Sequence, residues 1–86
     1  MITGPILSVN QYAVLMADGA TGHVFNTNES ISLKEDEDIY FIFDSLNTAK
    51  AFVVSKQKES QTIEFVIYNS DYDCVEYIEA MKYRSQ

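Results

Sequence analysis

The sequence predicts an α+β fold, with an antiparallel sheet of about five strands and one helix packed on one face, in the order β-β-β-α-β-β. Several short apolar segments show the two-residue alternation of strands, and clusters of Gly, Asn, Asp and Ser separate them. One segment between these strands has apolar residues at helical spacing instead. Because the chain has 86 residues, we expect a single domain, residues 1–86, with one hydrophobic core.

The first strands are predicted near the N-terminus. Gln11–Asp18 alternates apolar side chains between two faces, and the residues DGATG (18–22) then place two glycines within a short segment, which is a strong turn signal. His23–Thr27 can return as a short strand, so a hairpin is expected. Ile31 and Leu33 alternate with polar neighbours and indicate a further, weak strand.

The helix is predicted directly after a core strand. Ile39–Phe43 is apolar on both faces, which is typical of a central strand whose second face is covered. Asp44 or Ser45 can cap the helix that follows, and lysines near its end, in the segment KQKESQ (56–61), oppose the negative end of the helix dipole. The apolar stripe of this helix comprises Leu46, Ala49, Phe52 and Val53.

The C-terminal third predicts a second hairpin. Thr62–Tyr68 alternates as a strand, and NSDYD (69–73) is rich in short polar residues that form turns. Cys74–Tyr83 fits either a strand or a helix, and the short turn before it favours a strand with a frayed or helical end after Glu79.

The sheet face away from the helix is expected to be uncovered. The candidates for this face are Val66, Tyr68, Tyr12 and Tyr77. An apolar, aromatic and uncovered face on a small domain favours association with a second copy or with another protein.

The chain is strongly acidic, because 13 Asp and Glu residues outnumber 6 Lys and Arg residues and give a formal net charge of −7. Such a field repels the phosphates of nucleic acids and anionic lipids, so neither nucleic acid nor a membrane is expected as a partner. The same field attracts a basic protein and accelerates its encounter. Two explanations stay open, since acidity can also serve solubility alone.

A cytoplasmic location is expected from two features. Cys74 is the only cysteine, so no internal disulfide can form, which fits a reducing compartment. Residues 1–19 lack the basic region of a signal peptide, and polar residues interrupt their apolar positions. We therefore expect neither a signal peptide nor a membrane span.

The sequence does not predict an enzyme, a cofactor or a metal site. His23 is the only histidine, and the sequence places neither an orienting acid nor a nucleophile beside it. Cys74 has no visible activating partner. Asp71, Asp73 and Glu76 supply oxygen ligands, but their segment lacks the glycine and the closing glutamate of a calcium-binding loop.

The acidic run Glu35–Asp38 has two interpretations. It is either a solvated turn that keeps the edge of the next strand from pairing with other chains, or a negative patch that docks on a basic protein surface together with acids near residue 73. Under the second interpretation the candidate partner-binding residues are Glu35, Asp36, Glu37, Asp38, Asp71, Tyr72, Asp73 and Glu76.

The strand-to-helix segment YFIFDSLNTA (Tyr40–Ala49), followed by IEFVIYNSD (Ile63–Asp71), resembles small bacterial immunity proteins that accompany secreted polymorphic or contact-dependent toxins. The resemblance covers less than half of the chain. It implies a non-enzymatic cytoplasmic protein that binds one cognate toxin domain and blocks it. No motif fixes the binding residues of such proteins, so the candidate residues above rest on charge alone. The alternatives are a homo-oligomer, in the simplest case a homodimer, that uses its open sheet face, or a small-ligand binder.

Overall fold

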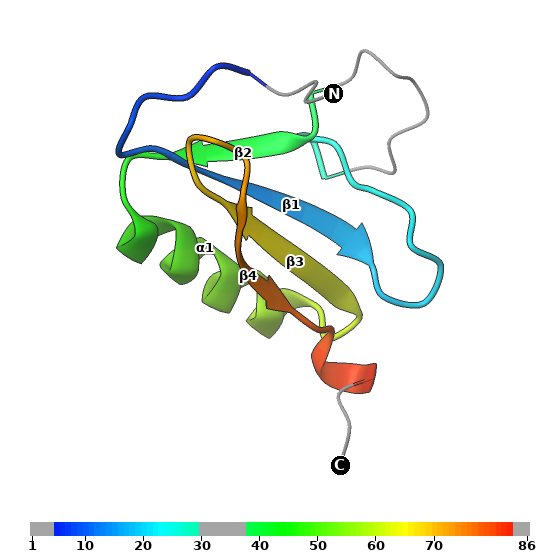
Figure 1. The fold of residues 1–86 in the computed structure, drawn as a ribbon. Coiled ribbons are helices and arrows are strands. Elements are labelled where there is room, and N and C mark those ends of the chain that lie inside the picture. The colour runs from blue at the N-terminus through cyan, green and yellow to red at the C-terminus, as the bar shows by residue number, and fades with distance from the viewer. Residues whose placement is uncertain (1–4, 30–37, 84–86) are drawn as a thin grey trace.

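The computed structural model describes residues 5–29 and 38–83. Ile31, Leu33 and Glu35–Glu37 lie outside this part of the chain. The described elements, in chain order, are β1 (Tyr12–Asp18), β2 (Tyr40–Phe43), α1 (Leu46–Glu59), β3 (Ile63–Tyr68), β4 (Cys74–Ile78) and the short 3-10 helix η1 (Met81–Tyr83) (Figure 1).

The four strands form one antiparallel sheet in the order β2-β1-β3-β4. Because β2 and β3 both run antiparallel to β1, they are parallel to each other, with β1 between them. The chain therefore crosses from one side of β1 to the other, and α1 makes this crossing while it packs on β1, β2 and β3 (Figure 1). The result is a two-layer α+β domain with one sheet face covered by the helix.

The predicted α+β class, with one helix on an antiparallel sheet, is confirmed, and the described residues form four strands where about five were predicted. The segment His23–Thr27 returns beside β1 as predicted, although it makes only an isolated bridge between Ala17 and Val24. The physical reason is competition for one edge of β1: β2 pairs with Tyr12–Leu15 on that edge, so few positions remain for the returning segment. The turn itself is tight, with Gly22 in the left-handed conformation (φ 79°).

The core lies between the sheet and the helix. The buried cluster comprises Val14, Met16, Ala49, Val53, Phe65 and Ile67. On α1, the ring of Phe52 lies 4.8 Å from the Phe41 ring and 5.0 Å from the Phe43 ring. The apolar stripe predicted for the helix therefore does face the sheet, and it fixes the side of the sheet that α1 covers.

The ends of the helix follow from local hydrogen bonds. Of the two predicted caps, Ser45 is the one used: its hydroxyl accepts from the Thr48 backbone amide at 3.1 Å. At the other end, the Ser60 amide donates to the Lys56 carbonyl at 3.0 Å. The helix thus begins and ends where the polar residues predict.

The C-terminal segment forms the predicted hairpin strand, β4, and ends in the 3-10 helix η1 after Glu79. The pairing of β3 with β4 shifts register between Ile67 and Tyr68. A shift of this kind inserts one extra residue on one strand and increases the local twist.

Candidate functional site

The sheet face opposite α1 consists of two rows of side chains that cross all four strands. We call this surface the open face. In strand order β2, β1, β3, β4, its first row is Tyr40, Leu15, Val66 and Tyr77, and its second row is Ile42, Ala13, Tyr68 and Cys74. Three of the four residues predicted for this face lie on it, and Tyr12 does not. Tyr12 pairs with Phe43 and packs against the core on the helix side, because it shares the alternation of Val14 and Met16.

The open face is shallow and partly covered by its own large side chains. Ala13 is fully buried among larger neighbours, while Leu15, Tyr40, Val66 and Tyr68 are half-buried. Ile42 is 38% exposed and Tyr77 is 54% exposed. An exposed apolar pair on a tyrosine-rich surface is the composition of a protein interface rather than of a ligand pocket.

Three tyrosines at one end of this face touch one another, and we call them the tyrosine cluster: Tyr40, Tyr68 and Tyr72. The centroid of the Tyr40 ring lies 6.1 Å from that of Tyr68 and 5.3 Å from that of Tyr72. The Tyr68 and Tyr72 centroids are 5.9 Å apart. The two Tyr40 pairs are edge-to-face, which is a favourable arrangement of the ring quadrupoles.

Tyr72 reaches the cluster from the turn between β3 and β4, in a backbone conformation that is unusual for its residue type. Its φ is 61°, in the left-handed region, where a residue with a Cβ costs about 1 to 2 kcal/mol. The turn is closed by the Tyr72 amide, which donates to the Asn69 carbonyl at 2.9 Å. The Asn69 side chain also accepts from the amides of Asp71 and Asp73. These bonds hold the backbone in the strained form.

The Tyr72 ring is also fixed at its far end. Its hydroxyl donates to the Pro5 carbonyl at 2.6 Å, which joins positions 67 residues apart. A second hydrogen bond anchors the same N-terminal segment: the Gln11 side-chain amide donates to the Asp44 carboxylate at 3.2 Å. Ile6 and Val9 in this segment remain exposed.

The surroundings of two cluster residues, Tyr68 and Tyr72, raise the pKa of their phenols. Burial, followed by Tyr40 and Asp38, raises the pKa of Tyr72 above its usual value. Burial also raises the pKa of Tyr68, with further contributions from Tyr40 and Cys74. Asp38 precedes Tyr40 by two residues, and the ring contact between Tyr40 and Tyr72 joins the start of β2 to the β3–β4 turn.

Elsewhere on the open face, Tyr77 donates its hydroxyl to the Glu64 carboxylate at 3.0 Å. This bond is the main reason why the pKa of Tyr77 is raised, because losing the proton would place two negative charges side by side.

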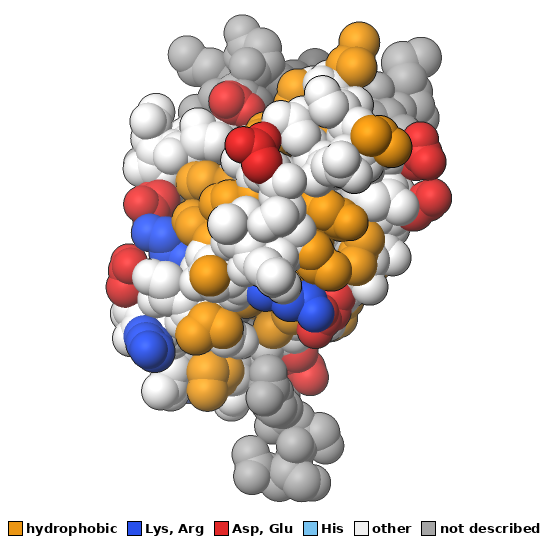
Figure 2. Space-filling view, turned by 90° about the vertical axis from the view of Figure 1, so that its left-hand side faces the viewer, with side chains coloured by type: hydrophobic (Ala, Val, Ile, Leu, Met, Phe, Trp, Pro, Cys, Tyr) orange, Lys and Arg blue, Asp and Glu red, His pale blue; other side chains and the backbone are white. Residues whose placement is uncertain are grey.

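The charged side chains are unevenly distributed. All four described lysines lie on α1 or η1, and they are Lys50, Lys56, Lys58 and Lys82. Within residues 5–29 and 38–83, the open face and the loops around it carry acids and no Lys or Arg. Figure 2 shows the end of the molecule on the left of Figure 1, where acidic side chains and lysines lie among separate apolar groups. Acids also lie on the helix side, since Glu29, Glu59 and Glu76 pair with lysines of α1, so the acidity is not gathered in one patch.

The structure brings some of the predicted binding residues together and separates others. Asp38 lies two residues before Tyr40, which contacts Tyr72, and Asp71 and Asp73 are exposed on either side of Tyr72 in the turn. Glu76 lies on the helix side, paired with Ile67 in the sheet, and its carboxylate is 3.6 Å from the Lys50 ammonium. Glu35, Asp36 and Glu37 are outside the described residues.

Sequence reasoning missed Tyr40 as a site residue. Strand alternation carries a signal for it, since Tyr40 must face away from Phe41. The sequence carries no signal for the contact between Tyr40 and Tyr72, because Tyr40 lies in β2 and Tyr72 lies in the distant turn between β3 and β4.

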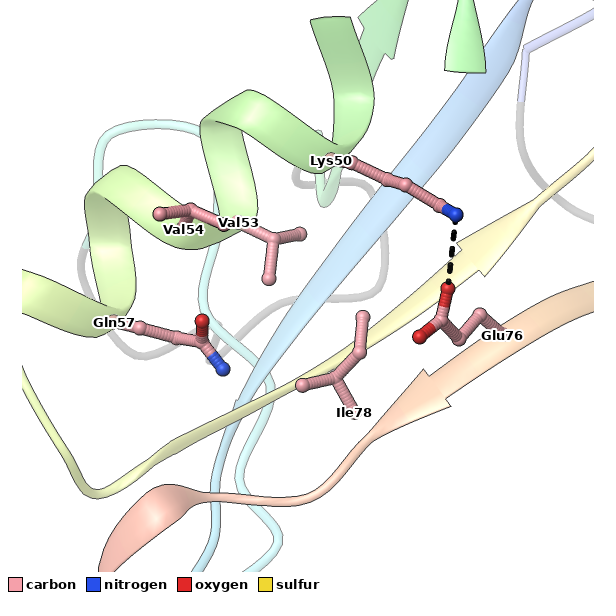
Figure 3. Close-up of a pocket in the computed structure, with 6 residues that line it drawn as sticks. All are labelled: Lys50, Val53, Val54, Gln57, Glu76 and Ile78. Atoms are coloured by element: carbon pink, nitrogen blue, oxygen red, sulfur yellow. Dashed lines mark ion pairs between the residues drawn. The ribbon is translucent and has the colours of Figure 1, made fainter. Parts of the chain in front are cut away.

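A second surface lies between α1 and β4. A hollow of about 190 Å³ is lined by Lys50, Val53, Val54, Gln57, Glu76 and Ile78. Figure 3 shows Lys50 and Glu76 pointing toward each other across its mouth, with Val53 and Ile78 between the two elements. A neighbouring hollow of about 270 Å³ shares Val54 and Gln57 with it. Ligand pockets usually have volumes of roughly 300 to 1,000 Å³. Both hollows are smaller than this range, so a small-ligand site fits poorly here.

Within the described part of the chain, no three His, Cys, Asp or Glu side chains are grouped so that they could hold a metal ion. The His23 ring bonds the Thr21 hydroxyl at 2.9 Å through Nδ1, a local contact on the turn after β1. None of the helices formed by residues 5–29 and 38–83 is long and apolar enough to cross a membrane.

Neither a protein-family model, nor a curated protein, nor a solved structure matches this chain.

Proposed function

We propose that this protein is a non-enzymatic binding module that holds a basic protein against its open face. In the form that the resemblance to immunity proteins implies, the protein is cytoplasmic, its partner is one cognate toxin domain, and binding blocks the toxin. The observation that carries the proposal is the distribution of charge among the described residues: every described lysine lies on α1 or η1, and the described charged residues on the open face and its loops are acids.

Electrostatics supports this choice of partner. With a net charge of −7, the protein attracts a basic surface from a distance and repels acidic ones. Because lysines of α1 offset the negative charge of Glu29, Glu59 and Glu76, the uncompensated negative charge of the described residues lies mainly away from the helix. A basic partner is thus steered toward the open face, where Ile42 and Tyr77 offer apolar contact.

The test uses the protein encoded beside this one in the genome. If that neighbour carries a basic toxin domain, co-expression should restore the growth that the toxin alone prevents, and calorimetry should give an affinity that falls steeply as salt increases. A toxic neighbour that is neither bound nor neutralised would contradict the proposal, and so would an affinity that salt leaves unchanged.

A homodimer through the open face is the second candidate. The exposed side chains of Ile42 and Tyr77 favour it, whereas self-repulsion between two chains of charge −7 opposes it. Sedimentation equilibrium separates the two functions, because a dimer that survives dilution and binds no basic protein would favour the homodimer.

A further inference from the structure

We infer that the tyrosine cluster, together with Asp38, is a receptor for a guanidinium group, so that an arginine of the basic partner stacks on its rings. This inference rests on the proposed function and names the side chain that the open face recognises. It makes the cluster the specific contact within a surface that otherwise attracts the partner by charge.

The geometry of the rings supports a stacking site. The three centroids lie within 5.3 to 6.1 Å of one another, so the rings form one continuous aromatic surface. None of the three side chains is fully buried. The face of a phenol ring carries negative charge and attracts a cation placed over it.

The charge around the rings selects a cation. Asp38 lies two residues before Tyr40, whose ring contacts that of Tyr72, and Asp71 and Asp73 are exposed on either side of Tyr72 in the turn. A guanidinium over the rings therefore gains a carboxylate partner as well. On the helix side, the Lys56 ammonium lies 5.6 Å from the centroid of the Phe52 ring. The described lysines lie on α1 and η1, not on the strands and the turn that carry the tyrosine cluster.

The position of Tyr72 supports recognition rather than simple turn formation. Gly or Asn occupies a left-handed position at lower cost, yet this turn carries a tyrosine at φ 61°. The bond from its hydroxyl to Pro5 then fixes the ring before any partner arrives. Rings that are fixed in advance lose less freedom on binding, which favours affinity.

Arginine suits this site better than lysine. The guanidinium is planar, so it stacks on an aromatic ring, and it is less strongly hydrated than an ammonium group. It can also donate two bonds to one carboxylate. A lysine would gain the charge attraction without the stacking.

The test needs no natural partner. We would titrate the protein at low salt with a capped tri-arginine peptide and, separately, with a capped tri-lysine peptide of equal charge, and follow the tyrosine ring signals by NMR. The arginine peptide should shift the rings of Tyr40, Tyr68 and Tyr72, while Tyr12 on the helix side serves as the internal reference. Replacing Tyr72→Asn should weaken arginine binding by about 2- to 5-fold, as expected for an exposed cation–π contact.

Two further variants make the test specific. Val54→Asn introduces the same residue at an exposed site on α1 and should leave binding unchanged. Tyr72→Phe keeps the ring and removes the bond to Pro5, so it should retain most of the arginine affinity. Dispersed NMR spectra of each variant confirm that the fold is kept.

Three outcomes would overturn the inference: equal ring shifts with both peptides, arginine-induced shifts confined to residues outside the cluster, or Tyr72→Asn binding as the wild type does. A basic partner that binds while the peptide leaves the rings unmoved removes this inference and keeps the proposed function. If the arginine peptide shifts the rings but the protein binds no basic partner, the inference is kept and the proposed function is removed.

Discussion

The Lys56 ammonium lies 2.6 Å from the Glu29 carboxylate, and this ion pair ties the segment after the first hairpin to the helix. Glu59 lies 3.5 Å away on the other side. The Lys56 side chain is only 15% exposed, whereas that of Glu29 is 49% exposed, and the Lys56 ammonium also lies 5.6 Å from the centroid of the Phe52 ring. Salt partly screens an ion pair with one half-exposed partner, so this contact should make a modest contribution to stability.

Replacing Lys56→Met tests that contribution. Methionine keeps the apolar stem and removes the charge, so we expect the free energy of unfolding to fall by about 1 kcal/mol, the upper end for partly exposed pairs. Lys58→Met is the matched control, because Lys58 is exposed on the same helix. Urea unfolding measures both variants, and equal midpoints would show that the ion pair adds nothing.

The same pair predicts how stability changes at alkaline pH. The bond to Glu29, opposed in part by burial, raises the pKa of Lys56 above 10.5. A group whose pKa is higher in the folded state stabilises the protein below its unfolded pKa, and loses this effect as the pH rises through the folded pKa. The difference in stability between wild type and Lys56→Met should therefore be constant at neutral pH and shrink above about pH 10.5. A difference that stays constant there would contradict the assignment. Comparison with the variant is needed because Tyr68 and Tyr72 also have raised pKa values.

The strain at Tyr72 predicts an unusually mild substitution. Tyr72→Asn loses ring contacts worth about 0.5 to 1.5 kcal/mol each, but asparagine relieves part of the cost of the left-handed conformation, about 1 to 2 kcal/mol. We expect the free energy of unfolding to change by about 1 kcal/mol or less. Tyr40→Asn is the control, since Tyr40 contacts the same rings from a regular strand and should cost about 2 kcal/mol. Equal losses in thermal unfolding would show that the turn is not strained.

The helix could be predicted from the sequence because its signals are local. The capping hydroxyl of Ser45, the stripe that includes Ala49 and Val53, and the late lysines all lie within a few residues of the element they define. The number of strands could not be predicted in the same way. Whether His23–Thr27 becomes a full strand depends on β2 occupying the same edge of β1, and that competition involves residues distant in the sequence.

The candidate site shows the same division. Alternation places Tyr68 on the open face, and the composition of the turn predicts a change of direction at Asn69. Neither indicates that Tyr72 takes the left-handed position and reaches Tyr40. The clustering of acids grouped Glu76 with Asp73, but Glu76 faces α1 and meets Lys50. The register shift between β3 and β4 is the reason, because it pairs Glu76 with Ile67 on the helix side while Cys74 pairs with Tyr68 on the open face.

The acidic run ahead of β2 makes a prediction about association rates. Replacing all four residues Glu35–Asp38 by lysine should slow the association of a basic partner and flatten its salt dependence, because the run supplies part of the attracting field. Stopped-flow or surface plasmon resonance kinetics at low and high salt measure the association rate and its salt dependence. If the rate and its salt slope stayed unchanged, the run would be the solvated turn of the alternative interpretation.

The position of the charges, as distinct from their number, can be tested with two double variants of equal net charge. Asp71→Asn with Asp73→Asn removes two acids beside the tyrosine cluster, whereas Asn47→Lys with Ser55→Lys adds two bases at exposed sites on α1. Each pair changes the net charge from −7 to −5. If a basic partner docks on the open face, the first pair should weaken binding severalfold, because the lost carboxylates would lie within about one Debye length of the partner. The second pair should have a smaller effect, since α1 lies behind the sheet. Calorimetry at one ionic strength decides between them, and equal losses from both pairs would mean that the partner responds only to total charge and that the open face is not where it binds.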